Sequence, residues 1–166
     1  MKRAYLQLHI AIFLWGFTGI LGRLITLQEF PLVWWRILIT IIALWVFLKV
    51  RKQLATVSKK KFLQMGFVGG LIALHWVTFF GAVKYSNVSI ALSALASTAV
   101  FTAILDPIWR GQRPSASELI FGLITLGGIY LIFQFQQLYT FGIILGLISA
   151  LLCAIFTIQT LSLIHI

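Results

Sequence analysis

Charged residues are scarce in this chain. They make up 10% of its 166 residues, whereas about a quarter of the residues in soluble globular domains are charged. Hydrophobic residues make up 61% and the mean hydropathy is +1.05. A soluble fold of this length has too little interior to bury so much apolar surface. The scarcity of charge therefore excludes an ordinary soluble domain and indicates a membrane protein.

Acidic residues and cysteine are nearly absent. The three acids lie near the ends of the apolar runs. Glu29 is expected in an outer loop, Asp106 is expected to pair with Arg110 one helical turn on, and Glu118 is expected at the start of the fifth span. A proton relay through carboxylates at mid-membrane therefore has no candidate. The single cysteine, Cys153, excludes an intramolecular disulfide and a metal site built on cysteines. Paired carboxylates, metal-ligand clusters and phosphate-binding loops are also missing from the sequence. We therefore expect no cofactor, no bound metal and no enzymatic activity.

Two long stretches carry no formal charge: 22 residues between Lys61 and Lys84, and 21 residues between Lys84 and Asp106. At about 1.5 Å per residue, each is long enough to cross a hydrocarbon core of about 30 Å. Four further apolar runs complete an all-α, polytopic fold with about six membrane-spanning helices. The expected spans are 6–22, 32–48, 62–83, 85–105, 119–133 and 141–160, with polar residues Gln134, Gln136, Gln137, Tyr139 and Thr140 separating the last two.

Basic residues gather on one side of the predicted spans. The segment 49–61, predicted to be a loop, carries six positive charges and no acid. If the N-terminus is cytoplasmic, ten of the thirteen basic residues lie on the cytoplasmic side, Arg23 and Lys84 lie outside, and Arg36 lies within a span. This bias predicts a multi-pass protein of the inner cell membrane with a cytoplasmic N-terminus. The net charge of +10 thus reflects membrane topology, and the expected partner is the lipid bilayer rather than nucleic acid.

Arg36 is the charged side chain placed inside a span. A charged group in a bilayer costs about 2.5 to 3.5 kcal/mol, so its position requires an explanation. It lies about 6 Å below the start of the second span by helix rise. Two interpretations are open: a structural arginine that snorkels outward or pairs with Glu29, or an anchor for a carboxylate or phosphate of a solute.

Other polar side chains fall at a similar depth. His75 lies about 20 Å along the third span, while Ser93 and Ser97 lie at i and i+4 on one face of the fourth. A polar layer in the outer half of the bundle is one interpretation, and bonding between helices is the alternative for His75 and the serines. His75 is also the titratable side chain placed for proton coupling. The predicted substrate-pathway residues are Trp15, Thr18, Arg36, His75, Ser93 and Ser97.

Two pairs of glycines suggest where helices pack closely. Gly66 and Gly70 stand four residues apart in the third span, and Gly142 and Gly146 do so in the sixth. Small residues at this spacing let backbones approach each other in lipid. We expect a packing seam at each pair.

Several short motifs occur in a characteristic order. They are Leu14-Trp15-Gly16 in the first span, Trp35-Arg36 in the second, residues 81–89 at the turn after the third, and residues 127–132 in the fifth. Over residues 6–160 the chain resembles the EamA-type transporters of the drug/metabolite transporter superfamily. The resemblance implies a ten-helix carrier of two five-helix repeats with inverted topology. It also implies alternating-access transport, often outward, of small organic metabolites such as amino acids.

This resemblance implies a domain organisation. Residues 1–138 correspond to the first repeat, and 139–160 to the first helix of a second repeat, whose missing C-terminal part is an expected partner beside the solute. A homo-oligomer is retained as an alternative. Residues 161–166 match the translation of CTG-TCT-CTT-ATA-CAC-ATC, a transposon end used in preparing sequencing libraries. We expect adapter read-through there, and the alternative is a genuine apolar helix end.

Three other functions remain as alternatives. A small multidrug-type proton antiporter uses a glutamate in its first helix, whereas residues 4–22 contain no acid. A non-transporting membrane enzyme needs a nucleophile and a base or a metal cluster near an interface, and neither His9 nor His75 belongs to such a group. An assembly subunit without transport activity is the third alternative.

Overall fold

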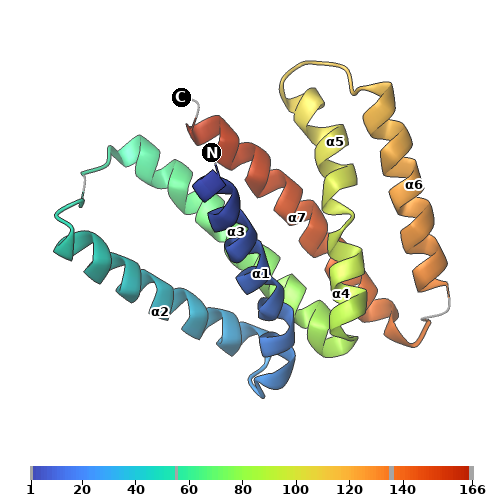
Figure 1. Ribbon diagram of the computed structural model, residues 1–166, viewed down its shortest axis with the longest axis horizontal. Helices are drawn as coiled ribbons and strands as arrows, with labels where there is room; N and C mark the ends of the chain where they lie inside the picture. Colours follow the sequence, from blue (N-terminus) through green and yellow to red (C-terminus); the bar gives the residue numbers. More distant parts are fainter. Residues whose placement is uncertain (1, 55, 135–136, 165–166) are drawn as a thin grey trace.

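A computed structural model describes residues 2–54, 56–134 and 137–164 of the chain. These residues form seven α-helices and one short 3-10 helix, and no strand occurs among them (Figure 1). Six candidate spans result, because α4 and α5 together form one apolar segment, Val88–Trp109. The chain is therefore an all-helical, multi-pass membrane protein. The elements are α1 (Lys2–Leu24), α2 (Glu29–Val50), α3 (Lys59–Tyr85), α4 (Val88–Leu95), α5 (Thr98–Trp109), α6 (Ala116–Phe133), η1 (Gln137–Tyr139) and α7 (Thr140–Ile164).

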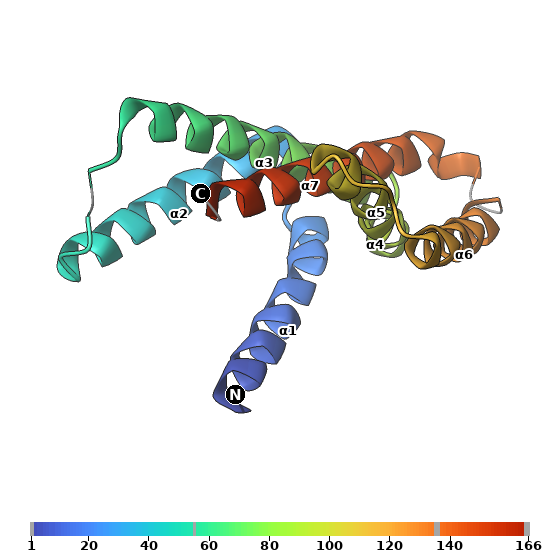
Figure 2. The ribbon, with the colours of Figure 1, turned by 90° about the horizontal axis from the view of Figure 1, so that it is seen from above.

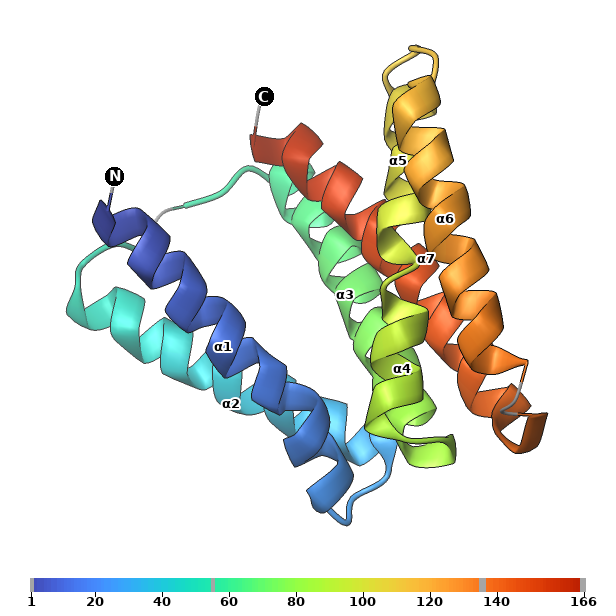
Figure 3. The same cartoon turned by 45° about the vertical axis from the view of Figure 1, so that its right-hand side comes forward.

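Helix α3 lies between two groups of helices and contacts both. It lies along α7 in the most extensive helix–helix contact, with α5 and α6 on one side and α1 and α2 on the other (Figure 1). Figure 2 shows that α1 leaves the layer formed by the other helices. In Figure 3, α1 approaches α3 near its own C-terminal end and diverges from it toward the N-terminus.

The connections alternate between two ends of the bundle. Residues 51–54, 56–58 and 110–115 lie at one end, which we call the lysine-rich end. Residues 25–28 and 86–87 lie at the other, which we call the α3–α4 end. The predicted loop 49–61 is shorter than expected, because Lys59, Lys60 and Lys61 belong to the first turn of α3. Ser58 starts that helix, since its Oγ accepts a hydrogen bond from the Lys61 N–H (3.4 Å).

Acidic residues lie near three other helix ends. Glu29, expected in a loop, is instead the first residue of α2. A carboxylate is favourable at that position because the N-terminus of a helix carries partial positive charge. Asp106 and Arg110 form the ion pair predicted from their spacing, with Oδ1 and Nε 2.9 Å apart. Glu118 lies in the first turn of α6, as predicted.

The linker before the last span is partly described. Gln134 directly follows α6, η1 comprises Gln137–Tyr139, and Thr140 begins α7. Gln136 lies outside the described residues. At the other end of α7, the helix continues beyond the expected end at Thr160 to Ile164, while residues 165–166 lie outside the described part.

The best-buried apolar cluster lies toward the α3–α4 end. It joins Phe80 and Val83 of α3 to Leu32 and Val33 of α2 and Ala91 of α4. Most large apolar side chains elsewhere are exposed on the helix surfaces. Such surfaces suit lipid, where apolar contact alone gives little preference for helix association. Close approach and polar bonds must therefore determine the packing.

Glycines provide the closest approach at one of the two predicted seams. A Cβ at Gly142 would lie 2.7 Å from the Ser86 Cβ, and a Cβ at Gly146 would lie 2.6 Å from the Ala94 Cβ. The seam predicted at Gly66 and Gly70 is wrong. Added Cβ atoms there meet no described atom within 4 Å, because this face of α3 packs against no neighbouring helix.

Two basic residues hold α1 to α3 at the α3–α4 end. Arg23 Nη1 of α1 donates to the carbonyls of Val83 (3.3 Å) and Lys84 (3.1 Å) in the last turn of α3. Lys84 Nζ in turn donates to the carbonyl of Ile25, just after α1. Cationic groups stabilise helix C-termini because the last carbonyls lack helical partners. We call this reciprocal arrangement the cross-cap.

Candidate functional site

A cavity of about 200 Å³ lies between α1, α3 and α4. Trp15 and Thr18 of α1 line it together with His75, Trp76 and Phe79 of α3. The walls are thus mainly apolar and aromatic, with Thr18 and His75 as polar groups. This composition suits a small organic molecule, because apolar walls give affinity and a few polar groups fix orientation. Three predicted pathway residues, Trp15, Thr18 and His75, therefore meet in what we call the α1–α3–α4 cavity.

Helix geometry places the α1 residues on this cavity. Trp15 and Thr18 stand three residues apart and so project from one helical face. Farther along α1, a Cβ at Gly19 would lie 3.1 Å from Val88 Cγ1, and a Cβ at Gly22 would overlap the Phe80 ring. These glycines bring α1 close to α3 and α4 next to the cavity. Trp15 remains 61% exposed, so α1 forms its more open wall.

His75 is the buried polar group of the site, with 4% of its surface exposed. Its Nδ1 lies 2.9 Å from both the carbonyl oxygen and the Oγ of Ser149 on α7. The Ser149 hydroxyl donates to the His75 carbonyl at 3.1 Å. The Phe156 ring lies beside the imidazole, with centroids 5.4 Å apart. Since Nδ1 faces Ser149 of α7, Nε2 is the ring nitrogen that points away from that contact.

Ser149 is not among the residues predicted from the sequence. It follows Gly142 and Gly146 on the same face of α7, because the steps of four and three residues match the helical repeat. The close seam at Gly146 brings α7 near enough for Ser149 to reach His75. The run of small residues Gly142, Gly146 and Ser149 is the sequence signal that could have identified it.

Arg36 lies beside the cavity rather than on its lining. Its Cζ is 4.7 Å from the centroid of the Trp76 ring and 5.7 Å from that of Phe80, which are cation–π distances. The predicted alternative of pairing with Glu29 is wrong: within the described residues, the ion pair found is Arg110–Asp106. Arg36 is therefore held by aromatic rings, one of which, Trp76, lines the cavity.

The stretch from Ser93 to Ser97 departs from the regular helix expected to place both serines on one face. The fourth span breaks between α4 and α5, at Ala96 and Ser97. There the Ser97 N–H donates to the Ala94 carbonyl (3.1 Å) and the Ala99 N–H to the Ala96 carbonyl (3.3 Å). The bonds thus change from the i→i−4 to the i→i−3 pattern. Neither proline nor glycine marks this break in the sequence.

The two serines consequently have different surroundings. Ser93 lines a separate cavity of about 450 Å³ with Arg23 and Asn87. Ser97 is 0% exposed, and among the described residues its Oγ has no hydrogen-bond partner. The next residue, Thr98, donates to the Ala150 carbonyl of α7 at 3.4 Å. Neither serine lines the α1–α3–α4 cavity, so their placement in one layer with His75 is not supported by the cavity.

A further cavity of about 590 Å³ lies between α5 and α6 at the lysine-rich end. It is lined by charged residues of both signs, Asp106, Arg110, Arg113 and Glu118. The described residues contain no group of three or more His, Cys, Asp or Glu side chains placed to hold a metal ion.

Comparison with known proteins identifies the family. The EamA-like transporter family matches residues 2–134, which include helices α1 to α6. No curated protein and no solved structure matches the chain significantly. Helix α7, which carries Ser149, follows the matched region. The match covers most of the sequence, and the chain therefore belongs to the EamA-like transporter family, membrane transporters of the drug/metabolite transporter superfamily.

Proposed function

We propose that this chain moves small organic metabolites, such as amino-acid-like solutes, through the α1–α3–α4 cavity. One observation carries the proposal: Trp15, Thr18 and His75, from two helices of a transporter-family chain, line one cavity. Aromatic walls with two polar groups suit a small amphipathic solute. Arg36, stacked on Trp76, favours a solute with a carboxylate or phosphate group near that wall.

The proposed carrier works by alternating access. Residues 1–138 act as a first five-helix repeat and residues 139–160 begin a second repeat of inverted topology, in a ten-helix whole. The family match over residues 2–134 supports the first boundary. The more open α1 wall of the cavity supports a pathway that faces the second repeat. Export is the direction that the family resemblance favours.

The proposed orientation has the N-terminus in the cytoplasm, in the inner cell membrane. Ten of the thirteen basic residues, all except Arg23, Arg36 and Lys84, then lie on the cytoplasmic side. The positive-inside bias supports this choice. The solute is proposed to cross without chemical change, as membership of a transporter family implies.

Counterflow of labelled amino acids and related metabolites in proteoliposomes tests the proposal. The protein is reconstituted as this chain and, in parallel, fused to a second EamA-type repeat. We expect at least one solute to accumulate, and Trp15→Ala or His75→Ala to reduce its rate about tenfold, equivalent to about 1.4 kcal/mol. Trp34→Ala is the control, because the Trp34 ring is 66% exposed and outside the cavity lining.

Two outcomes contradict the proposal. One is the absence of exchange in both preparations across the panel. The other is an equal loss of exchange in the Trp34→Ala and Trp15→Ala proteins. Catalytic turnover of a lipid by the chain would favour a membrane enzyme instead.

A further inference from the structure

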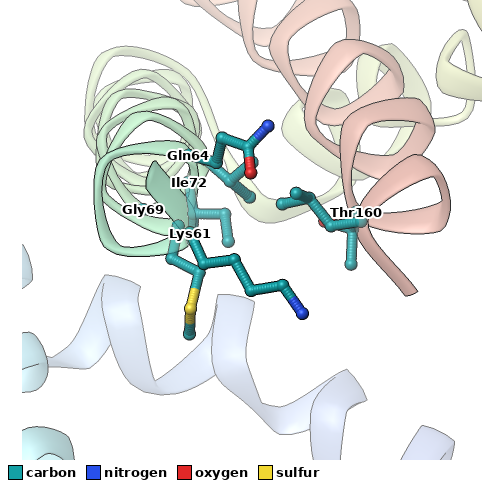
Figure 4. A pocket seen from close by; sticks show the side chains of 8 residues that line it. Lys61, Gln64, Gly69, Ile72 and Thr160 are labelled. Carbon is teal, nitrogen blue, oxygen red and sulfur yellow. The ribbon is translucent and has the colours of Figure 1, made fainter. Parts of the chain in front are cut away.

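A groove of about 510 Å³ opens between the N-terminal half of α3 and the C-terminal end of α7. Figure 4 shows Lys61 and Gln64 reaching from α3 toward Thr160 of α7. Beyond these polar groups, the α3 side is lined by Met65, Val68, Gly69 and Ile72. The groove therefore has a polar mouth at the lysine-rich end and an apolar body. It shares no lining residue with the α1–α3–α4 cavity.

The groove follows the direction that a lipid chain takes in a bilayer. From Lys61 to Ile72 is eleven residues, or about 16 Å of helix, which is about half of a hydrocarbon core. The groove is open at Gly69, because a Cβ there would meet no described atom within 4 Å. Since α3 is a membrane span, the open side of the groove at this depth faces acyl chains rather than water.

Positive charges gather at the mouth of the groove. Lys59, Lys60 and Lys61 all lie in the first turn of α3, which contains no acid. The N-terminal turn of a helix already carries partial positive charge, so these ammonium groups add to it instead of neutralising it. Residues 49–61 contain no carboxylate that offsets the charge. An anionic group bound at the mouth of the groove lowers the repulsion between these positive charges.

We propose that the groove binds an anionic phospholipid of the leaflet at the lysine-rich end. The phosphate lies at Lys61 and Gln64, and one acyl chain lies along Val68, Gly69 and Ile72. A zwitterionic lipid fits the apolar body but lacks the net charge that the lysines attract. The bound lipid bridges α3 and α7 next to the basic segment, independently of the solute that the cavity carries.

Competition between two lipids tests this site. The purified chain in detergent is incubated with an equimolar mixture of phosphatidylglycerol and phosphatidylcholine, and the lipids retained after gel filtration are quantified by mass spectrometry. We expect about fivefold enrichment of phosphatidylglycerol, since one lysine near an anionic surface contributes about 1 kcal/mol. Lys61→Gln brings the ratio close to one. Gly69→Leu lowers the retention of both lipids because its side chain fills the groove.

Matched control variants distinguish changes in the groove from the general effects of added bulk or lost charge elsewhere in the protein. Gly66→Leu is the control for Gly69→Leu, because Gly66 also faces open space on α3 but does not line the groove. Lys52→Gln is the control for Lys61→Gln, because it removes a charge from the same basic segment outside the lining. Both controls should keep the enrichment. If Gly69→Leu fails to fold, the headgroup ratio and Lys61→Gln decide the matter.

Three results overturn the proposal. One is equal retention of the two lipids by the unmodified chain. Another is the same loss of retention in the Gly66→Leu and Gly69→Leu proteins. The third is a dimer without bound lipid, which would make a second copy of the chain the occupant of the groove.

Discussion

Helices α7 and α1 both pack against α3, but over different stretches of it. Helix α7 contacts Ser86, which directly follows α3, and Ala94 of α4 through its glycine seam, and it bonds to α3 through His75 and Ser149. Helix α1 approaches α3 near its C-terminal end, where the cross-cap joins the two helices (Figure 3). Farther toward its N-terminus, α1 lines the α1–α3–α4 cavity.

This difference assigns unequal roles to the two sides of the cavity. In lipid, close backbone approach and polar bonds provide the preference for one helix arrangement over another. The N-terminal part of α7 has both, at Gly142, Gly146 and Ser149, whereas the polar attachment of α1 lies at its C-terminal end. We therefore expect α3 and α7 to form a fixed wall, and α1 to be the wall that moves as a rigid body about the α3–α4 end.

The largest effect is expected at the glycine seam. In Gly146→Leu the new side chain begins 2.6 Å from the Ala94 Cβ, so α7 must move away from α4. We expect the free energy of unfolding to fall by about 3 kcal/mol, the upper part of the range for overpacked cores. Denaturant unfolding in micelles, followed by circular dichroism, measures it. Gly127→Leu on α6, where an added Cβ meets open space, should be close to neutral; equal losses would refute the seam.

A smaller effect is expected from the polar bond in the same wall. Ser149→Ala removes the hydroxyl that donates to the His75 carbonyl. Hydrogen bonds between membrane helices contribute about 0.6 kcal/mol on average and up to about 1.7, and we expect a loss of about 1 kcal/mol in the same unfolding assay. Ser93→Ala, in the separate cavity, is the control and should change stability less. If Ser93→Ala lowers the free energy of unfolding as much as Ser149→Ala or more, the hydrogen bonds between His75 and Ser149 do not account for the effect.

Removing the cross-cap should destabilise α1 rather than the whole protein. Arg23→Ala leaves the Val83 and Lys84 carbonyls without their cationic donor, and we expect a local loss of about 0.5 to 1 kcal/mol. Hydrogen exchange should therefore become faster in α1 and remain unchanged in α7. Arg113→Ala at the lysine-rich end serves as the control. Equal acceleration in α1 and α7 would mean that α1 is not attached independently.

Arg36→Lys should have the smallest effect and should act on transport. Lysine keeps the positive charge near Trp76 but lacks the planar fork that binds a carboxylate at two points. We expect counterflow of an anionic solute to fall about threefold, equivalent to about 0.7 kcal/mol, with membrane insertion unchanged. Rates equal to those of the unmodified protein would leave Arg36 a structural role on the Trp76 and Phe80 rings.

Local sequence patterns predicted much of this fold. The six spans follow from uninterrupted apolar runs, because a membrane helix satisfies its backbone bonds within a single segment. The i,i+4 spacing of Asp106 and Arg110 was likewise sufficient for their ion pair. The seam at Gly142 and Gly146 was predicted correctly, since small residues are needed wherever helices touch in lipid.

Contacts between distant segments were not predictable in the same way. Gly66 and Gly70 have the spacing of a seam but face no helix, because spacing does not specify a partner. The aromatic neighbours of Arg36 and the reach of Arg23 to α3 depend on how the helices are placed. The break at Ala96 and Ser97 lacks a proline or glycine signal, and Ser93 and Ser97 have different surroundings on either side of it.

Protection from thiol labelling tests the central claim that the α1–α3–α4 cavity holds the solute. Cys153, the only cysteine, is first replaced by alanine, and Thr18→Cys and Ser93→Cys are then compared in that background. A saturating solute that gives counterflow should slow the reaction of Thr18→Cys with a small methanethiosulfonate reagent about tenfold. The same solute should leave the labelling rate of Ser93→Cys unchanged. Protection of Ser93→Cys without protection of Thr18→Cys would contradict the claim and place the solute in the separate cavity.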